Sequence, residues 1–153
     1  LSLPLINYSC KTLSFDVTAD ITDLSAIDLS NAIKNKSLSC EDVMKAYLTR
    51  IHKYNPVYNA IISMVDDESL IHQAKEADKA LSRGEYWGWM HGMPHAVKDL
   101  AAVKGMRYTS GSPIFAERIA DEDSDTLSRI RNQGVVIGKF LIAQFFFFGQ
   151  PPL

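Results

Sequence analysis

The sequence predicts an α/β protein with a mixed or parallel sheet. Helix-like and strand-like segments alternate along residues 21–139, and this alternation favours a sheet covered by helices. The 153 residues are 46% hydrophobic and 22% charged, which is typical of an ordinary globular chain of about one domain. We expect an irregular segment over 1–20, a folded part over 21–139 and an apolar tail over 140–153.

Three helices are expected in the first half of the folded part. Ser25 predicts a helix that runs to about residue 35, because a serine side chain can accept a hydrogen bond from a free N–H group at a helix start. The run Ser39–Asp42 (SCED) resembles a capping box and predicts a second helix, which Asn55-Pro56 should stop. Apolar residues at helical spacing predict a third helix over 68–82.

The second half of the folded part should supply most of the sheet. Short apolar runs bounded by turn-forming residues predict strands over 60–65, 96–99 and 135–138. A loop containing the run TSGSP leads from the second strand towards a helix over 124–133, and Gly134 is expected to cap that helix at its C-terminus.

Charge, hydropathy and cysteine spacing exclude several classes of partner. Sixteen Lys and Arg residues are interspersed with eighteen Asp and Glu residues and form no basic stripe. Direct binding of nucleic acid is therefore not expected. The apolar run Phe140–Phe148 contains Gln144 and is shorter than the ~20 residues that span a bilayer, so no membrane partner is expected. Cys10 and Cys40 lack CxxC spacing, which predicts thiols that pack in a reducing, cytoplasmic compartment. The first residue is Leu1, so an upstream targeting segment stays open.

No cofactor and no metal are expected. The segment 134–140 (GVVIGKF) is one residue too short between its glycines for a phosphate loop, and it has Phe where Ser or Thr must reach magnesium. His91 and His95 are four residues apart, but the glycine and proline between them oppose the helix that a zinc pair would need. The acidic run 121–123 is expected to complement a helix dipole in solvent.

Two serines and one lysine are the remaining candidate catalytic residues. Ser110 and Ser112 flank a glycine, which is commoner in turns than in catalytic loops, and no G-x-S-x-G elbow is present. Lys98 interrupts the apolar strand of HGMPHAVKDL, and its side chain should point away from those of Val97 and Asp99. Such a lysine either lies at an exposed strand edge, where its charge discourages aggregation, or it has a function.

A series of elements then follows a fixed order: Gly92-x-Pro94-x-x-Val97-Lys98-Asp99, Gly105, Thr109-x-Gly111-Ser112, Asp125 with Leu127 and Ile130, and Gly134–Lys139. A helix pair that ends in Tyr54-Asn55-Pro56 precedes this series. Together these elements resemble the N-terminal part of the amidase signature family, with coverage from about Ile21 to Lys139. The resemblance implies that residues 21–139 form part of an α/β sandwich with a mixed sheet, and that 140–153 is a tail outside the family pattern.

The resemblance also implies a hydrolase of carbon–nitrogen amide bonds that acts on a small-molecule amide through a Ser, cis-Ser, Lys triad. In that family the lysine of the Val-Lys-Asp element, here Lys98, relays protons through one serine to a second, nucleophilic serine. A lysine with its ordinary pKa of about 10.4 is a poor base at neutral pH, so we expect burial in the sheet to disfavour its charged form.

The residues after Lys139 depart from the family pattern. The family continues into a Gly/Ser-rich stretch that holds both catalytic serines, whereas 140–153 reads FLIAQFFFFGQPPL, as after a shifted reading frame or in a truncated gene model. Neither serine has a counterpart, so we expect the chain as given to be an inactive N-terminal fragment. A non-catalytic remnant or interaction module stays open as an alternative, as does the amidase-type component of a tRNA amidotransferase. The amide substrate and the oligomeric state are likewise open.

Overall fold

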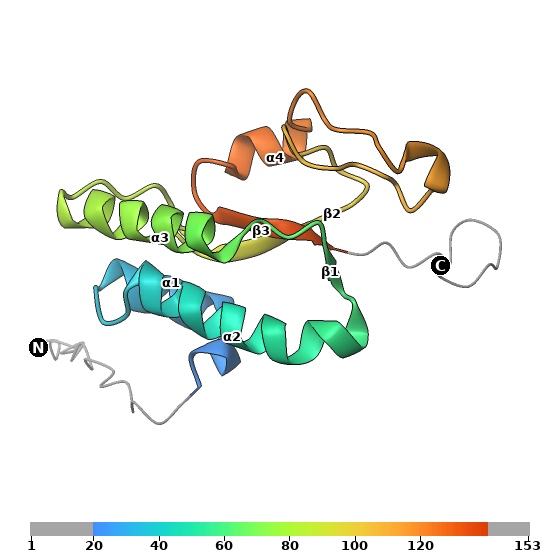
Figure 1. The fold of residues 1–153 in the computed structure, drawn as a ribbon. Coiled ribbons are helices and arrows are strands. Elements are labelled where there is room, and N and C mark those ends of the chain that lie inside the picture. The colour runs from blue at the N-terminus through green and yellow to red at the C-terminus, as the bar shows by residue number, and fades with distance from the viewer. Residues whose placement is uncertain (1–19, 141–153) are drawn as a thin grey trace, which may run out of the picture.

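A computed structural model describes residues 20–140, whose helices and strands are shown in Figure 1. In chain order they form η1 (Ile21–Asp23), α1 (Ala26–Lys34), α2 (Cys40–Tyr58), β1 (Ile61–Ile62), α3 (Asp67–Ser82), β2 (Pro94–Lys98), η2 (Pro113–Phe115), α4 (Asp125–Ile130) and β3 (Val135–Phe140), where η is a 3₁₀ turn. The predicted α/β class is confirmed. Cys10 and the predicted tail after Phe140 lie outside the described residues.

The strands form a mixed sheet in the order β1-β3-β2, with β1 antiparallel and β2 parallel to β3. The register of β2 against β3 shifts in the middle of the pair. His95 pairs with Val136, whereas the next residue, Ala96, pairs with Gly138, so β3 carries one extra residue. A bulge of this kind bends the strand and re-aims the side chains that follow, the first of which belongs to Lys139.

Helices cover the sheet, with α1 and α2 on one side and α4 on the other (Figure 1). The main core lies where α1, α2 and α3 meet the sheet, and it includes Leu29, Ile33, Cys40, Val43, Met44, Leu70, Ala74, Ala77, Met93, Val135 and Ile137. Burial raises the pKa of the Cys40 thiol to about 12. This thiol is therefore protonated at neutral pH and packs as a small apolar group, as predicted. Among residues 20–140, no helix combines the length and the apolar character needed to cross a membrane.

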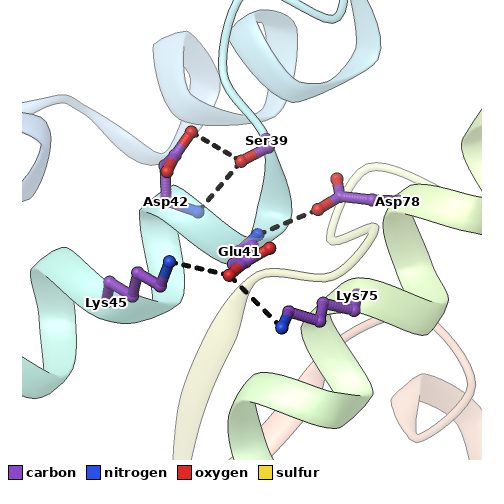
Figure 2. Close-up of polar contacts among 6 residues, drawn as sticks. All are labelled: Ser39, Glu41, Asp42, Lys45, Lys75 and Asp78. Carbon is purple, nitrogen blue, oxygen red and sulfur yellow. Dashed lines mark hydrogen bonds and ion pairs between the residues drawn. The ribbon is translucent and has the colours of Figure 1, made fainter.

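The predicted helix starts at Ser25 and Ser39 are confirmed. The Ser25 side chain accepts a hydrogen bond from the N–H of Asp28, and the Ser39 side chain accepts one from the N–H of Asp42 at 3.0 Å. The Asp42 carboxylate accepts a bond from the Ser39 hydroxyl at 2.7 Å, so the two residues hold each other (Figure 2). Serine therefore starts both helices by supplying an acceptor for an N–H group without a helical partner.

Asp78 of α3 provides a second cap for α2. Its carboxylate accepts hydrogen bonds from the N–H groups of Cys40 at 2.7 Å and Glu41 at 3.0 Å. Figure 2 shows Asp78 beside the start of α2, with the Glu41 side chain between Lys45 and Lys75. A negative charge at this position also complements the positive end of the helix dipole, so α3 fixes the start of α2.

We expect Asp78→Ala to lower the free energy of unfolding by about 1–2 kcal/mol, since loss of a helix cap costs this much. Urea denaturation followed by circular dichroism would measure the change. Glu76→Ala on the same helix is the control, because the Glu76 carboxylate pairs with the exposed Lys79 and should matter little. Equal destabilisation by the two substitutions would refute the capping role of Asp78.

The prediction that Asn55-Pro56 stops α2 is wrong. The helix continues to Tyr58 and ends at Asn59, whose φ of 44° is left-handed. Pro56 lies in the last turn, where its missing N–H removes a single helical bond. The Asn55 side chain also bonds both the N–H and the carbonyl of Ile61, each at 2.8 Å, and so ties the helix end to β1.

The three strands begin or end at other residues than predicted. The strand expected over 60–65 is limited to Ile61–Ile62, because Ser63 has a left-handed φ of 49°. The strand expected over 96–99 begins two residues earlier and ends one residue earlier, whereas that expected over 135–138 extends to Phe140.

Gly134 does not cap α4, so that prediction is also wrong. The helix ends at Ile130 with Arg131 as its C-cap. A Cβ atom on Gly134 would lie 2.8 Å from Nδ1 of His95 and 2.9 Å from the carbonyl oxygen of Met93. The glycine therefore permits β3 to approach β2 closely.

Candidate active site

The parallel strands β2 and β3 end at the same edge of the sheet, where Lys98 pairs with Phe140. The carboxyl ends of parallel strands commonly line ligand sites in α/β proteins. Lys98 is exposed and the next residue, Asp99, is buried, so their side chains lie in different environments, as the strand alternation predicts. The expected burial of Lys98 is not found within residues 20–140, because Lys98 ends a strand at the border of the sheet.

Asp99 anchors the loop that follows β2. Its carboxylate accepts hydrogen bonds from the N–H of Thr109 at 3.2 and 3.3 Å and from the Thr109 hydroxyl at 2.5 Å. The Thr109 hydroxyl in turn accepts a bond from the N–H of Gly111 at 3.2 Å. Since the N–H of Asp99 also donates to the carbonyl of Phe140, this residue joins the ends of both strands to the loop.

Lys139 is completely buried beneath the same loop. Its ammonium donates to the carbonyl of Ala101 and lies 5.6 Å from the centre of the Tyr108 ring. Burial lowers the pKa of Lys139, and the negative charge of Asp99 partly opposes this effect. Two ionisable residues of opposite charge are therefore buried beside the exposed Lys98.

Sequence reasoning missed the buried position of Lys139, which entered only as part of an excluded phosphate loop and as the last residue of the Gly134–Lys139 element of the family resemblance. The residue occupies a strand, in agreement with that exclusion. The signal that could have found it is a lysine at the end of the apolar run GVVIGK, the same feature that draws attention to Lys98.

The two serines of the loop have turn geometry. Ser110 has a left-handed φ of 50°, and Ser112 precedes η2, where its hydroxyl accepts a bond from the N–H of Ile114 at 3.4 Å. Asp123 differs from the solvated charge that was predicted. It accepts a bond from the N–H of Lys104 at 2.7 Å and pairs with Arg131, so it links the loop to the end of α4.

The two histidines of the HGMPH segment are both packed residues. His91 is buried, with Nε2 2.9 Å from the carbonyl of Ala77 and Nδ1 accepting from the N–H of Trp87 at 3.1 Å. Both ring nitrogens of His95 are buried without a hydrogen-bond partner in the described part of the chain, and burial lowers the pKa of this ring. Across residues 20–140, no group of three or more His, Cys, Asp or Glu side chains could hold a metal ion.

Comparison with known proteins establishes the family. The family model described as Amidase matches residues 42–150, which is more than half of the chain. The chain belongs to the amidase family. Its helices, mixed sheet and Val-Lys-Asp element are therefore parts of an amidase fold, as the resemblance implied.

Curated relatives and solved structures agree with this assignment. The A-type component of the glutamyl-tRNA(Gln) amidotransferase from Lachnoclostridium phytofermentans is 35% identical over 128 residues, or 82% of this chain and 26% of that protein. The corresponding protein of Clostridium kluyveri is 34% identical over 80% of this chain and 25% of that protein. The peptide amidase of Stenotrophomonas maltophilia matches with a TM-score of 0.71 and 25% identity, over 80% of this chain and 26% of that one. A fatty acid amide hydrolase matches with a TM-score of 0.75 and 25% identity, over 83% and 22%. This amidase chain spans about a quarter of the length of these relatives.

Proposed function

We propose that this chain supplies the lysine-bearing part of an amidase that hydrolyses carbon–nitrogen amide bonds through a Ser, cis-Ser, Lys triad, with Lys98 as the proton relay. The observation that carries the proposal is the position of Lys98 at the joint carboxyl end of β2 and β3. Its side chain is exposed there and can meet serines supplied by further polypeptide. The loop that follows β2 is held by the hydrogen bonds between Asp99 and Thr109, and it would keep a fixed conformation beside Lys98.

The chemistry of each group follows from this arrangement. Polypeptide that covers Lys98 would desolvate its amine and favour the neutral form, which can accept a proton. The neutral amine would take a proton from the first serine as that serine takes one from the second. The second serine then attacks the amide carbonyl carbon, and the nitrogen leaves with a returned proton. Water attacks the resulting acyl-enzyme ester by the same relay, which releases the acid and restores the serine.

We expect the 153-residue chain alone to hydrolyse no amide above background, since neither serine of the triad has a counterpart in it. Activity should appear in a joined protein, in which residues 1–139 are followed by the part of the Stenotrophomonas maltophilia peptide amidase that this chain does not match. The activity of both proteins is measured as the release of ammonia from a peptide amide. Turnover by the 153-residue chain would contradict the assignment of the missing serines, and a folded but inactive joined protein would favour a non-catalytic remnant.

A second candidate function is that of the amidase-type component of a tRNA amidotransferase. The observation in its favour is the name of the curated relatives, which are 34–35% identical, whereas the amidase structures are 25% identical. Both candidate functions use Lys98 as the proton relay. They differ in which amide is hydrolysed and in what happens to the ammonia that is released. Completion of the chain with the remainder of the Clostridium kluyveri protein would separate them, because ammonia release that requires glutamine and the other amidotransferase components would support the amidotransferase.

A further inference from the structure

Lys139 holds the turn that directly follows Lys98. This turn comprises residues 98–101, and the N–H of Ala101 closes it by donating to the carbonyl of Lys98 at 2.9 Å. The carbonyl of Ala101 accepts a hydrogen bond from the ammonium of Lys139, which reaches it from β3. The turn is therefore fixed both by its own backbone bond to Lys98 and by the side chain of Lys139.

The register shift between β2 and β3 decides on which face of the sheet Lys139 lies. An unbroken register from the pair His95–Val136 would place Lys139 directly beside Lys98. Neighbouring residues of adjacent strands point to the same face, so two positive charges would then lie side by side and repel each other. The extra residue in β3 instead pairs Lys139 with Val97, which turns its side chain to the other face. The shift therefore separates the two lysines and brings Lys139 beneath the loop.

Packing alone does not account for a lysine at position 139. Its side chain has no exposed surface, and burial of an amine costs solvation free energy. An apolar side chain of similar length would fill the same volume without this cost. What such a side chain cannot do is donate to the carbonyl of Ala101, the contact that the Lys139 ammonium makes beside the ring of Tyr108.

The same contacts distinguish the role of Lys139 from that of Lys98. A proton acceptor must come within hydrogen-bond reach of the hydroxyl group on which it acts. The ammonium of Lys139 is buried and donates to Ala101, whereas the side chain of Lys98 is exposed at the joint end of the two strands. Lys139 can therefore influence the reaction only through Lys98.

We propose that Lys139 is a positioning residue for Lys98, because it fixes the turn 98–101 and with it the direction of the Lys98 amine. This inference rests on the proposed function, since that direction matters to the reaction only if the amine carries protons. The backbone of Lys98 is held on its N-terminal side by pairing with β3 and on its C-terminal side by the turn. Loss of the turn frees the second side, and a displacement of about 1 Å in a catalytic group can cost about 10²-fold in rate.

Amide hydrogen exchange in the 153-residue chain tests the turn without any turnover. We expect Lys139→Met to accelerate exchange of the Ala101 N–H at least about tenfold more than that of the Val135 N–H, which bonds Met93 in the paired strands. A role limited to overall stability would not accelerate Ala101 more than Val135, because global unfolding exposes both amides. Ile137→Val is the matched control, since it removes a buried methyl group from the core side of the same strand and should produce no excess at Ala101.

Two results of the exchange experiment would overturn the proposal. One is acceleration of the Ala101 and Val135 amides by the same factor in Lys139→Met. The other is an equal excess at Ala101 in Ile137→Val. If Lys139→Met does not fold, Lys139→Gln takes its place, because its amide ends one bond short of the position of the ammonium. The same excess at Ala101 is expected of it, and equal factors would again overturn the proposal.

Turnover by the joined protein gives the second readout. Lys139→Met should lower kcat per folded molecule at least about tenfold and leave KM within about a factor of two, because a misdirected amine affects the transition state and not substrate binding. An unchanged kcat per folded molecule would overturn the positioning role. Failure of the proposed function looks different: a parent protein that hydrolyses nothing, with the excess exchange at Ala101 still present, removes the catalytic role of Lys98 while Lys139 still fixes the turn.

Discussion

In the joined protein, Lys98→Ala should lower the rate of amide hydrolysis by at least about 10²-fold, the usual effect of losing a positioned acid-base group. The loss should fall mainly on kcat, because the amine acts on protons in the transition state and need not hold the substrate. Lys98→Arg should restore little activity, since a guanidinium remains protonated and cannot accept the proton of a hydroxyl group.

Lys104 is the matched control for these substitutions. It lies in the loop that follows β2, is exposed, and uses its backbone N–H to bond Asp123. Lys104→Ala should therefore leave turnover nearly unchanged, as expected of a solvated surface side chain. If Lys98→Arg were as active as the parent, Lys98 would act only as a positive charge, and the proton relay would have to be abandoned.

Local chemistry explains which parts of the fold could be predicted from the sequence. The starts at Ser25 and Ser39 were predictable because a cap acts through the two or three residues next to it. The stop expected at Pro56 failed because the side chain of Asn55 reaches β1 and stabilises the last turn of α2. That contact depends on where the chain goes next, which local propensity does not contain.

The candidate site likewise combines features that neighbouring residues determine with features that depend on distant contacts. Lys98 stood out in the sequence because a lysine in an apolar strand is unusual, but its proposed role came from the resemblance to the amidase family. The burial of Lys139 depends on the extra residue that β3 inserts opposite β2, and a register shift leaves no local mark. The loop anchor at Asp99 was likewise hidden, since its partner Thr109 is ten residues away in the sequence.

The second large effect concerns the buried carboxylate of Asp99, and we expect Asp99→Leu to destabilise the chain by about 2–3 kcal/mol, because hydrogen bonds to a charged group are lost and their donors are left without an acceptor. The substitution deprives Thr109 of its acceptor and leaves the Lys139 ammonium buried without a nearby negative charge. Asp99→Asn should cost less, because an amide oxygen can still accept from Thr109. The double substitution Asp99→Leu with Lys139→Met should cost less than the sum of the two single changes, as measured by urea denaturation.

The pH dependence of stability tests the charge of Lys139 directly. Burial holds the pKa of this lysine below its ordinary value of 10.5, whereas Asp99 raises it. Between the lowered pKa and 10.5 the unfolded chain binds more protons than the folded chain, so the contribution of Lys139 to stability rises with pH across that window. Asp99→Asn removes the raising effect, which widens the window and should make the total rise larger, whereas Lys139→Met should abolish this contribution. Identical urea midpoints against pH for the parent, Asp99→Asn and Lys139→Met would show that Lys139 is solvated in solution and that its ammonium does not hold the loop.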